Sequence, residues 1–187
     1  MPFSERDSLD KPAYDVRGLL DNLPWLDELV QAMMSARARV FAQPGVDALR
    51  AWANEAADTS IERLTAAKRM GVLYGAYLSW LQLRDFRQAK AMLPMLKKAA
   101  GGHAPALRLV QLLETELAFK EEDMRGAVNS LMNMANQASP SWPRPELLYF
   151  SQAVSRLQTT SPSSDTSALL AKAVQGLQRT VLQNPQD

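Results

Sequence analysis

An aspartate recurs at a fixed interval along this chain, because Asp47, Asp85 and Asp123 are separated by 38 residues each time. A small residue follows each aspartate four positions later, and these residues are Ala51, Ala89 and Ala127. Aspartate accepts hydrogen bonds from the free amides that begin a helix. An alanine one turn later lets a neighbouring helix approach closely. The repeat therefore predicts stacked helical hairpins, each covering the apolar face of the next.

The composition excludes several kinds of site. The chain of 187 residues is 47% hydrophobic, which suits one domain or a short solenoid. It contains no cysteine, which excludes disulfides, thiolate zinc sites and cysteine nucleophiles. No apolar run approaches the roughly 20 residues that a membrane-spanning helix needs. The net charge of +1 conceals a basic middle, since residues 37–108 carry twelve bases and five acids.

The helical periodicity places the domain boundaries. Residues 1–22 are polar and contain two prolines, so we expect a flexible N-terminal arm there. In residues 23–187 apolar positions recur at helical spacing, without the alternation typical of strands. The predicted fold class is all-α, with four antiparallel helical hairpins stacked as a right-handed solenoid. We expect these hairpins at about 24–57, 60–100, 104–137 and 145–183.

Three of the predicted helices have faces that bear on later results. In the first helix we expect Leu26, Leu29, Val30, Met33, Val40 and Phe41 to point inward. In the helix from about Ser60 to Leu83, the stripe Ala67, Gly71 and Gly75 predicts a close approach by another helix. In the last helix, which begins near Asp165, we expect an inward face of Leu169, Leu170, Val174, Leu177 and Val181.

These units resemble degenerate tetratricopeptide repeats. In that family a turn with glycine, aspartate and an aromatic residue precedes an alanine on the second helix. Arg84-Asp85-Phe86 with Ala89 fits this pattern except that arginine replaces glycine, and Glu122-Asp123-Met124 with Ala127 fits less well. The period also differs from the usual 34 or so residues. The resemblance covers residues 24–183 and implies a superhelix whose first helices line a concave protein-binding surface.

A second resemblance rests on short strings: Tyr14-Asp15-Val16-Arg17, Ser35-Ala36-Arg37-Ala38-Arg39-Val40, the Asp85 repeat and Pro143-Arg144-Pro145-Glu146-Leu147-Leu148. They look like the C-terminal repeat region of bacterial beta-barrel assembly-enhancing metalloproteases. In those periplasmic zinc peptidases an H-E-x-x-H domain precedes the repeats, which are understood to dock on outer-membrane protein assembly machinery. This chain has no H-E-x-x-H and only one histidine, His103. The resemblance thus implies a periplasmic repeat module without its protease domain, and zinc only if such a domain exists elsewhere.

Non-catalytic binding of a protein or peptide is the function that the sequence predicts. The candidate contacts lie on the first helix of the second hairpin and at its end: Lys68, Arg69, Tyr77, Trp80 and Arg84. We assign no catalytic, cofactor-binding or metal-binding residue. The resemblance implies that the partner is outer-membrane assembly machinery or a protease domain.

Other features have simpler interpretations. We interpret His103, which follows two glycines, as a surface turn residue. The acidic residues around one helix end are interpreted as a solvated turn rather than an acid–base pair; they are Glu114, Glu116, Glu121, Glu122 and Asp123. Pro94, flanked by Met92 and Met95, predicts a kinked helix and suggests a methionine-lined peptide groove.

The basic middle leaves an alternative function open, a free-standing cytoplasmic adaptor for an acidic protein or nucleic acid. Its bases are Arg37, Arg39, Arg50, Arg63, Lys68, Arg69, Arg84, Arg87, Lys90, Lys97 and Lys98. Nucleic acid is disfavoured, because the nearby aromatic residues Tyr74, Tyr77 and Trp80 have a spacing that suits core packing at least as well as base stacking.

Overall fold

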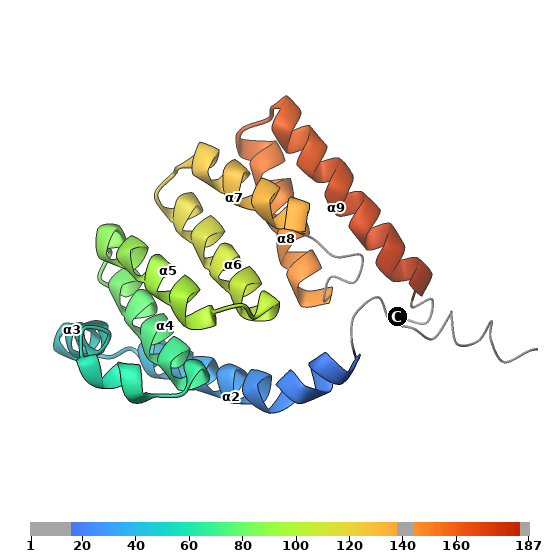
Figure 1. Ribbon diagram of the computed structural model, residues 1–187. Coiled ribbons are helices and arrows are strands. Elements are labelled where there is room, and N and C mark those ends of the chain that lie inside the picture. Colours follow the sequence, from blue (N-terminus) through green and yellow to red (C-terminus); the bar gives the residue numbers. More distant parts are fainter. Residues whose placement is uncertain (1–15, 138–143, 184–187) are drawn as a thin grey trace, which may run out of the picture. The chain divides into compact units, whose positions relative to one another are not determined.

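The structure is a computed structural model that describes residues 16–137 and 144–183 (Figure 1). All regular elements in these residues are helical, which confirms the all-α fold class for the described part of the chain. The elements are α2 (Val16–Phe41), α3 (Val46–Glu55), the 3-10 helix η1 (Thr59–Arg63), α4 (Ala66–Gln82), α5 (Phe86–Ala100), α6 (Ala104–Lys120), α7 (Met124–Gln137), α8 (Arg144–Thr160) and α9 (Ser164–Gln183). They form two compact units, one up to Val110 and one from Gln111 onward.

The beginning of the described chain differs from expectation. α2 begins at Val16, so residues 16–22, expected in a polar arm, are helical, and Pro24 stands inside the helix. The remainder of the expected arm, residues 1–15, lies outside the described residues. The helical periodicity does not predict η1, and α4 begins at Ala66 rather than near Ser60.

Local hydrogen bonds explain why η1 forms. The Asp58 carboxylate accepts a hydrogen bond from the Ser60 amide at 2.8 Å. Bonds from the Ser60 backbone and then from its hydroxyl lower the pKa of Asp58 below its ordinary value. Thr65 then caps α4 by accepting from the Lys68 amide at 3.3 Å, and its hydroxyl donates to Glu28 of α2 at 3.1 Å.

The α4–α5 and α6–α7 connections share one turn geometry. In the first, Arg84 has a φ of 57°, its N–H donates to Leu81 O at 3.0 Å, and the Asp85 N–H donates to Trp80 O at 3.0 Å. In the second, Glu122 also has a φ of 57°. Its N–H donates to Phe119 O at 3.2 Å, and the Asp123 N–H donates to Ala118 O at 2.8 Å. Two such bonds around a left-handed residue form a Schellman motif, which ends a helix.

The aspartate of each turn begins the next helix. Asp85 accepts a hydrogen bond from the amide three residues ahead at 3.0 Å, and Asp123 does the same at 2.8 Å. Each carboxylate thus satisfies a free amide of the following helix. The alanines one turn later, Ala89 and Ala127, are fully buried. One residue therefore ends a helix and the next caps its successor, which makes these two copies of the repeat structurally equivalent.

Asp47, the first aspartate of the repeat, and Asp165 do not cap, contrary to the predicted pattern. Gly45 is the N-cap of α3 and provides no side-chain bond, so Asp47 lies within the first turn, and the alanine four residues after it is exposed. Asp165 also lies within a first turn. The start of α9 is held by Ser163 and Thr166, whose hydroxyl groups accept each other's amide protons at 3.2 and 2.7 Å. This reciprocal arrangement is a capping box in which threonine takes the second position.

α4 is the central helix of the first unit and packs against α2, α3 and α5 (Figure 1). A Cβ added at Gly71 would lie 2.7 Å from Ala32 Cβ, well inside the roughly 3.5–4.0 Å of an ordinary carbon contact. A Cβ at Gly75 would lie 3.4 Å from Ala36 Cβ and 3.3 Å from an Arg39 nitrogen. The predicted stripe of small residues is therefore confirmed as the surface that α2 approaches closely.

The predicted inward face of α2 is only partly correct. Leu29 and Val40 are buried, and Leu26 and Met33 are half-buried. Val30 and Phe41, however, are exposed. Each follows an inward residue by one position, which is about 100° around the helix, and so lies beyond the reach of α4.

The second unit has its own core, to which α6, α7, α8 and α9 all contribute. α8 packs along α9, and α7 contacts both. The buried residues of α7 and α8 include Ala127, Leu131, Met134, Phe150, Val154 and Leu157. In α9, Leu169 is buried as predicted, whereas Leu170 and Val174 are exposed. Leu177 and Val181 lie outside the residues whose side chains are described.

The cap assignment predicts that replacing three aspartates by alanine lowers the free energy of unfolding by different amounts. Asp85→Ala and Asp123→Ala should each lower the free energy of unfolding by about 1 kcal/mol, because each leaves a first-turn amide without its acceptor. Asp47→Ala should change it by less than about 0.5 kcal/mol, since Asp47 makes no cap bond. Urea unfolding followed by circular dichroism measures all three. An equal loss at Asp47 and Asp85 would contradict the assignment.

The close contact of α2 with α4 predicts whether replacing Gly71 raises or lowers the free energy of unfolding. Alanine is intrinsically favoured in a helix by about 1 kcal/mol. Gly71→Ala should nevertheless lower the free energy of unfolding by about 1–2 kcal/mol, because the new methyl group overlaps Ala32. Gly102→Ala is the control, since its added methyl meets nothing within 4 Å. Thermal unfolding that shows Gly71→Ala to be stabilised would disprove the close approach.

Candidate functional site

The five residues predicted to bind a partner do not form one surface. Four belong to α4, and Arg84 belongs to the turn that follows it. Lys68 and Arg84 are exposed, but they lie at opposite ends of α4, about 24 Å apart along a helix. Trp80 is half-buried near the end with Arg84. A single ligand site with all five residues is therefore not present in this arrangement.

Tyr77, which the sequence predicts as a partner contact, has a wholly buried side chain. Every residue from Leu73 to Ser79 is buried, since α4 has neighbours on three sides. A central helix shows little amphipathic contrast, so its periodicity does not distinguish an aromatic residue in the core from one in a groove.

Arg69 is a structural residue. Its Nε donates to Ile61 O at 3.2 Å, and its Nη2 donates to Glu62 O at 2.7 Å and Leu64 O at 3.2 Å. The Glu62 carboxylate lies 3.9 Å from Nη1. The guanidinium thus holds η1 against the start of α4, and its donors are used within the chain.

Arg39 likewise connects elements of the first unit. Two of its nitrogens donate to the Glu55 carboxylate at 3.1 and 3.4 Å, and its guanidinium lies 4.6 Å from the centre of the Trp52 ring. The bidentate pair joins α2 to α3, and planar stacking on an aromatic ring suits arginine rather than lysine. Two members of the predicted basic set, Arg39 and Arg69, therefore serve the fold.

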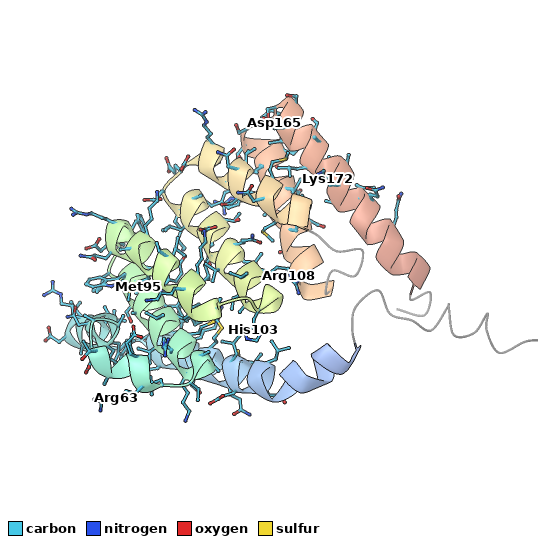
Figure 2. The ribbon with its side chains drawn as sticks, in the orientation of Figure 1. Arg63, Met95, His103, Arg108, Asp165 and Lys172 are labelled. Carbon is cyan, nitrogen blue, oxygen red and sulfur yellow. The ribbon has the colours of Figure 1, made fainter. Side chains whose placement is uncertain are left out.

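The bases of α5 are better placed for a partner. Arg87, Lys90, Lys97 and Lys98 are all exposed, and residues 86–100 include no acid. Met95, labelled on α5 in Figure 2, is exposed, and Met92 is half-buried. α5 runs continuously through Pro94. The methionine-lined groove and the kink stay predictions.

The structure places His103 and part of the acidic cluster at turns between helices. His103 lies between α5 and α6 and is half-buried (Figure 2). Glu122 and Asp123 belong to the α6–α7 turn, one as its left-handed residue and the other as a helix cap. Among the described residues, no group of three or more histidine, aspartate or glutamate side chains could hold a metal ion.

The exposed stripe of α9 was missed by the sequence reasoning. The stripe consists of Ser167, Leu170, Ala171, Val174 and Gln178, and each of them lies three or four residues from another member, which places them on one side of a helix. Together with Lys172 and Gln175 they line a shallow depression of about 610 Å³. Leu169 and Leu170 point about 100° apart around the helix. Leu169 is buried in the core that α8 and α9 share, and Leu170 is exposed.

Comparison with known protein families, with curated proteins and with solved structures finds no match. The resemblances to tetratricopeptide-repeat proteins and to assembly-enhancing metalloproteases therefore rest on short strings and stay predictions. Within the described ranges, none of the helices has the length and apolar character that crossing a membrane requires.

The role of Arg69 can be tested against its neighbour. Arg69→Met should lower the free energy of unfolding by about 2 kcal/mol, because three carbonyls lose a charged donor. Limited proteolysis should then cut residues 59–64 faster. Lys68→Met, on the exposed side of the same turn, should change stability by less than about 0.5 kcal/mol. Equal effects of the two substitutions would refute a structural role specific to Arg69.

Proposed function

We propose that this chain is a non-catalytic helical-repeat module whose partner presents an amphipathic helix to the apolar stripe of α9. The observation that carries the proposal is the exposure of Leu170 and Val174 on one helix face, 37% and 45% respectively, within a shallow depression. Apolar side chains gathered on a solvent-facing surface mark sites of protein–protein contact.

The geometry of the stripe suits a helix rather than an extended peptide. From Ser167 to Gln178 it spans three helical turns, or about 16 Å. The small side chains of Ser167 and Ala171 allow a close approach, and Leu170 and Val174 fit between the residues of a partner stripe with the same spacing. Gln175 and Gln178 give the depression neutral hydrogen-bonding groups and Lys172 adds one positive charge, so affinity should depend less on salt than binding by α5 would.

We further propose that the hairpins stack as a tetratricopeptide-like right-handed solenoid. The support is the shared turn, because Arg84-Asp85 and Glu122-Asp123 end and begin helices by the same bonds. In a solenoid each hairpin covers the apolar face of the one before it. A partner helix on α9 would occupy the place that a further hairpin takes in a longer array.

A second candidate is an acidic partner bound by α5. Its four exposed bases, Arg87, Lys90, Lys97 and Lys98, favour that candidate. Binding of this kind is electrostatic and weakens as salt is added, which distinguishes it from an apolar contact on α9.

The narrower expectation, an accessory region of a periplasmic zinc metalloprotease, stays a prediction from the resemblance. The reading frame upstream of Met1 in the genome tests it directly. An H-E-x-x-H motif encoded in the same frame would support a protease parent, whereas an unrelated gene or a stop codon there would end that interpretation.

Selection from a displayed library of amphipathic helices tests the α9 surface. The retained helices should carry apolar residues at i, i+3 or i+4, and i+7, and Val174→Glu should weaken their binding at least about tenfold. Ala168→Glu is the matched control, because it adds the same charge to an exposed position of α9 outside the depression. Binding that survives Val174→Glu, or that disappears with salt and with Lys90→Glu, would transfer the site to α5.

A further inference from the structure

α2 carries two parallel stripes of residues, one inward and one exposed. The inward stripe is buried or half-buried and consists of Leu26, Leu29, Met33, Ala36 and Val40. The exposed stripe follows it one residue later and consists of Asp27, Val30, Met34, Arg37 and Phe41. The inward stripe faces α4, which α2 packs against. The second stripe therefore needs a different explanation.

The exposed stripe is apolar at its centre. Val30 and Met34 are 57% and 61% exposed, and Phe41 is 48% exposed. The Arg37 guanidinium lies 5.2 Å from the centre of the Phe41 ring, so the arginine is held along the helix surface. The steps between successive members are three, four, three and four residues. This alternation is the a/d pattern by which helices pair in coiled coils.

The charges of this stripe are arranged symmetrically about its middle. If two copies of α2 lie antiparallel and related by a twofold axis at residue 32, Asp27 of one copy lies level with Arg37 of the other. In the same register Val30 lies level with Met34 of the second copy. Shifting one helix by a heptad places Arg37 level with Met34 in one direction, or Asp27 level with Val30 in the other. The stripe thus pairs opposite charges and apolar groups with itself in one antiparallel register.

We propose that a second copy of this chain is the occupant of the exposed α2 stripe, forming an antiparallel homodimer in which Val30 and Met34 make the centre and Asp27 of each copy pairs with Arg37 of the other. A parallel pair is disfavoured, because it would place Asp27 against Asp27 and Arg37 against Arg37.

Among the described residues of the first unit, the neighbours of α2 leave this side open to a partner. Arg39, which pairs with Glu55 of α3, lies two residues from Arg37 and from Phe41. A step of two residues turns the helix by about 200°, so α3 lies on the opposite flank. The exposed residues beside the stripe, Gln31 and Ala38, are uncharged. Within the first unit a second helix can therefore lie along the stripe without displacing α3 or α4.

The size of the contact indicates a weak dimer. In this register the two stripes overlap over residues 27–37, about 15 Å of helix, and such a contact buries less than the roughly 1,200 Å² of a standard stable interface. A dissociation constant on the order of 10 μM is expected. Charge pairs at both ends fix the orientation more than they add affinity.

Sedimentation equilibrium of the full chain between about 1 and 200 μM tests the proposal. The wild type should change from monomer to dimer across this range. Met34→Glu should raise the dissociation constant at least about tenfold, because it places two carboxylates at the apolar centre. Ser35→Glu is the matched control, since it adds the same charge on the flank of α2 away from the stripe. A monomer at all concentrations, or a dimer unaffected by Met34→Glu, overturns the proposal.

Reversal of the charges tests the register and does not depend on a variant that fails to fold. Asp27→Arg and Arg37→Asp should each weaken the dimer, because each replaces both opposite-charge pairs with like charges. The double variant Asp27→Arg/Arg37→Asp should recover the wild-type dissociation constant. Wild type and double variant, when mixed, should not form a mixed dimer, since their charges match only in the parallel orientation. Mixed dimers, or a double variant as weak as the single ones, would refute the antiparallel arrangement.

The α9 surface and the α2 stripe are separable in these experiments. Val174→Glu should leave the dissociation constant of the homodimer unchanged, because α9 takes no part in the proposed contact. A Val174→Glu chain that loses self-association would show that α9, rather than α2, holds the two copies together and would overturn the assignment to α2.

Discussion

The first unit depends on how closely α2 can approach α4. Gly71 has no side chain where Ala32 crosses it, and a methyl group there would come within 2.7 Å of the Ala32 Cβ. The same approach brings Arg39 to Gly75, from where it reaches Glu55 and Trp52 of α3. The contact therefore determines the position of α3 as well as that of α2. It also determines which face of α2 remains exposed, and this exposed face forms the proposed dimer contact.

The repeated turn shows how the chain changes direction without a loop. Arg84 and Glu122 adopt a left-handed conformation that costs a non-glycine residue about 1–2 kcal/mol. This conformation allows two backbone hydrogen bonds that end one helix and an aspartate cap that begins the next. Because each of these bonds contributes about 1 kcal/mol, together they can offset the strain. This explains how arginine and glutamate are tolerated in a conformation that favours glycine.

Helix caps and close helix contacts were predictable from the sequence. Which side chains the tertiary packing buries was less predictable. The caps Asp85 and Asp123 and the stripe at Gly71 follow from what carboxylates and small residues do in any helix. Asp47 failed as a cap because Gly45, two residues earlier, begins α3. The burial of Tyr77 was not predictable, because the helices that cover α4 lie elsewhere in the sequence. The candidate site on α9 was missed for a related reason, since a run of adjacent apolar residues does not say which of them the next helix will cover.

The two proposed surfaces would act together. Each copy of the chain carries one α9, so a homodimer through α2 presents two stripes of Leu170 and Val174. A partner with two suitable helices would then bind the second stripe at the effective concentration set by the first contact, and the gain in affinity can reach about 10²–10⁴-fold where geometry allows both to engage. A weak single contact would then suffice for selective binding. Because the dimer itself is weak, such a partner would also stabilise it by linkage, so binding and self-association would increase together with the concentration of either protein.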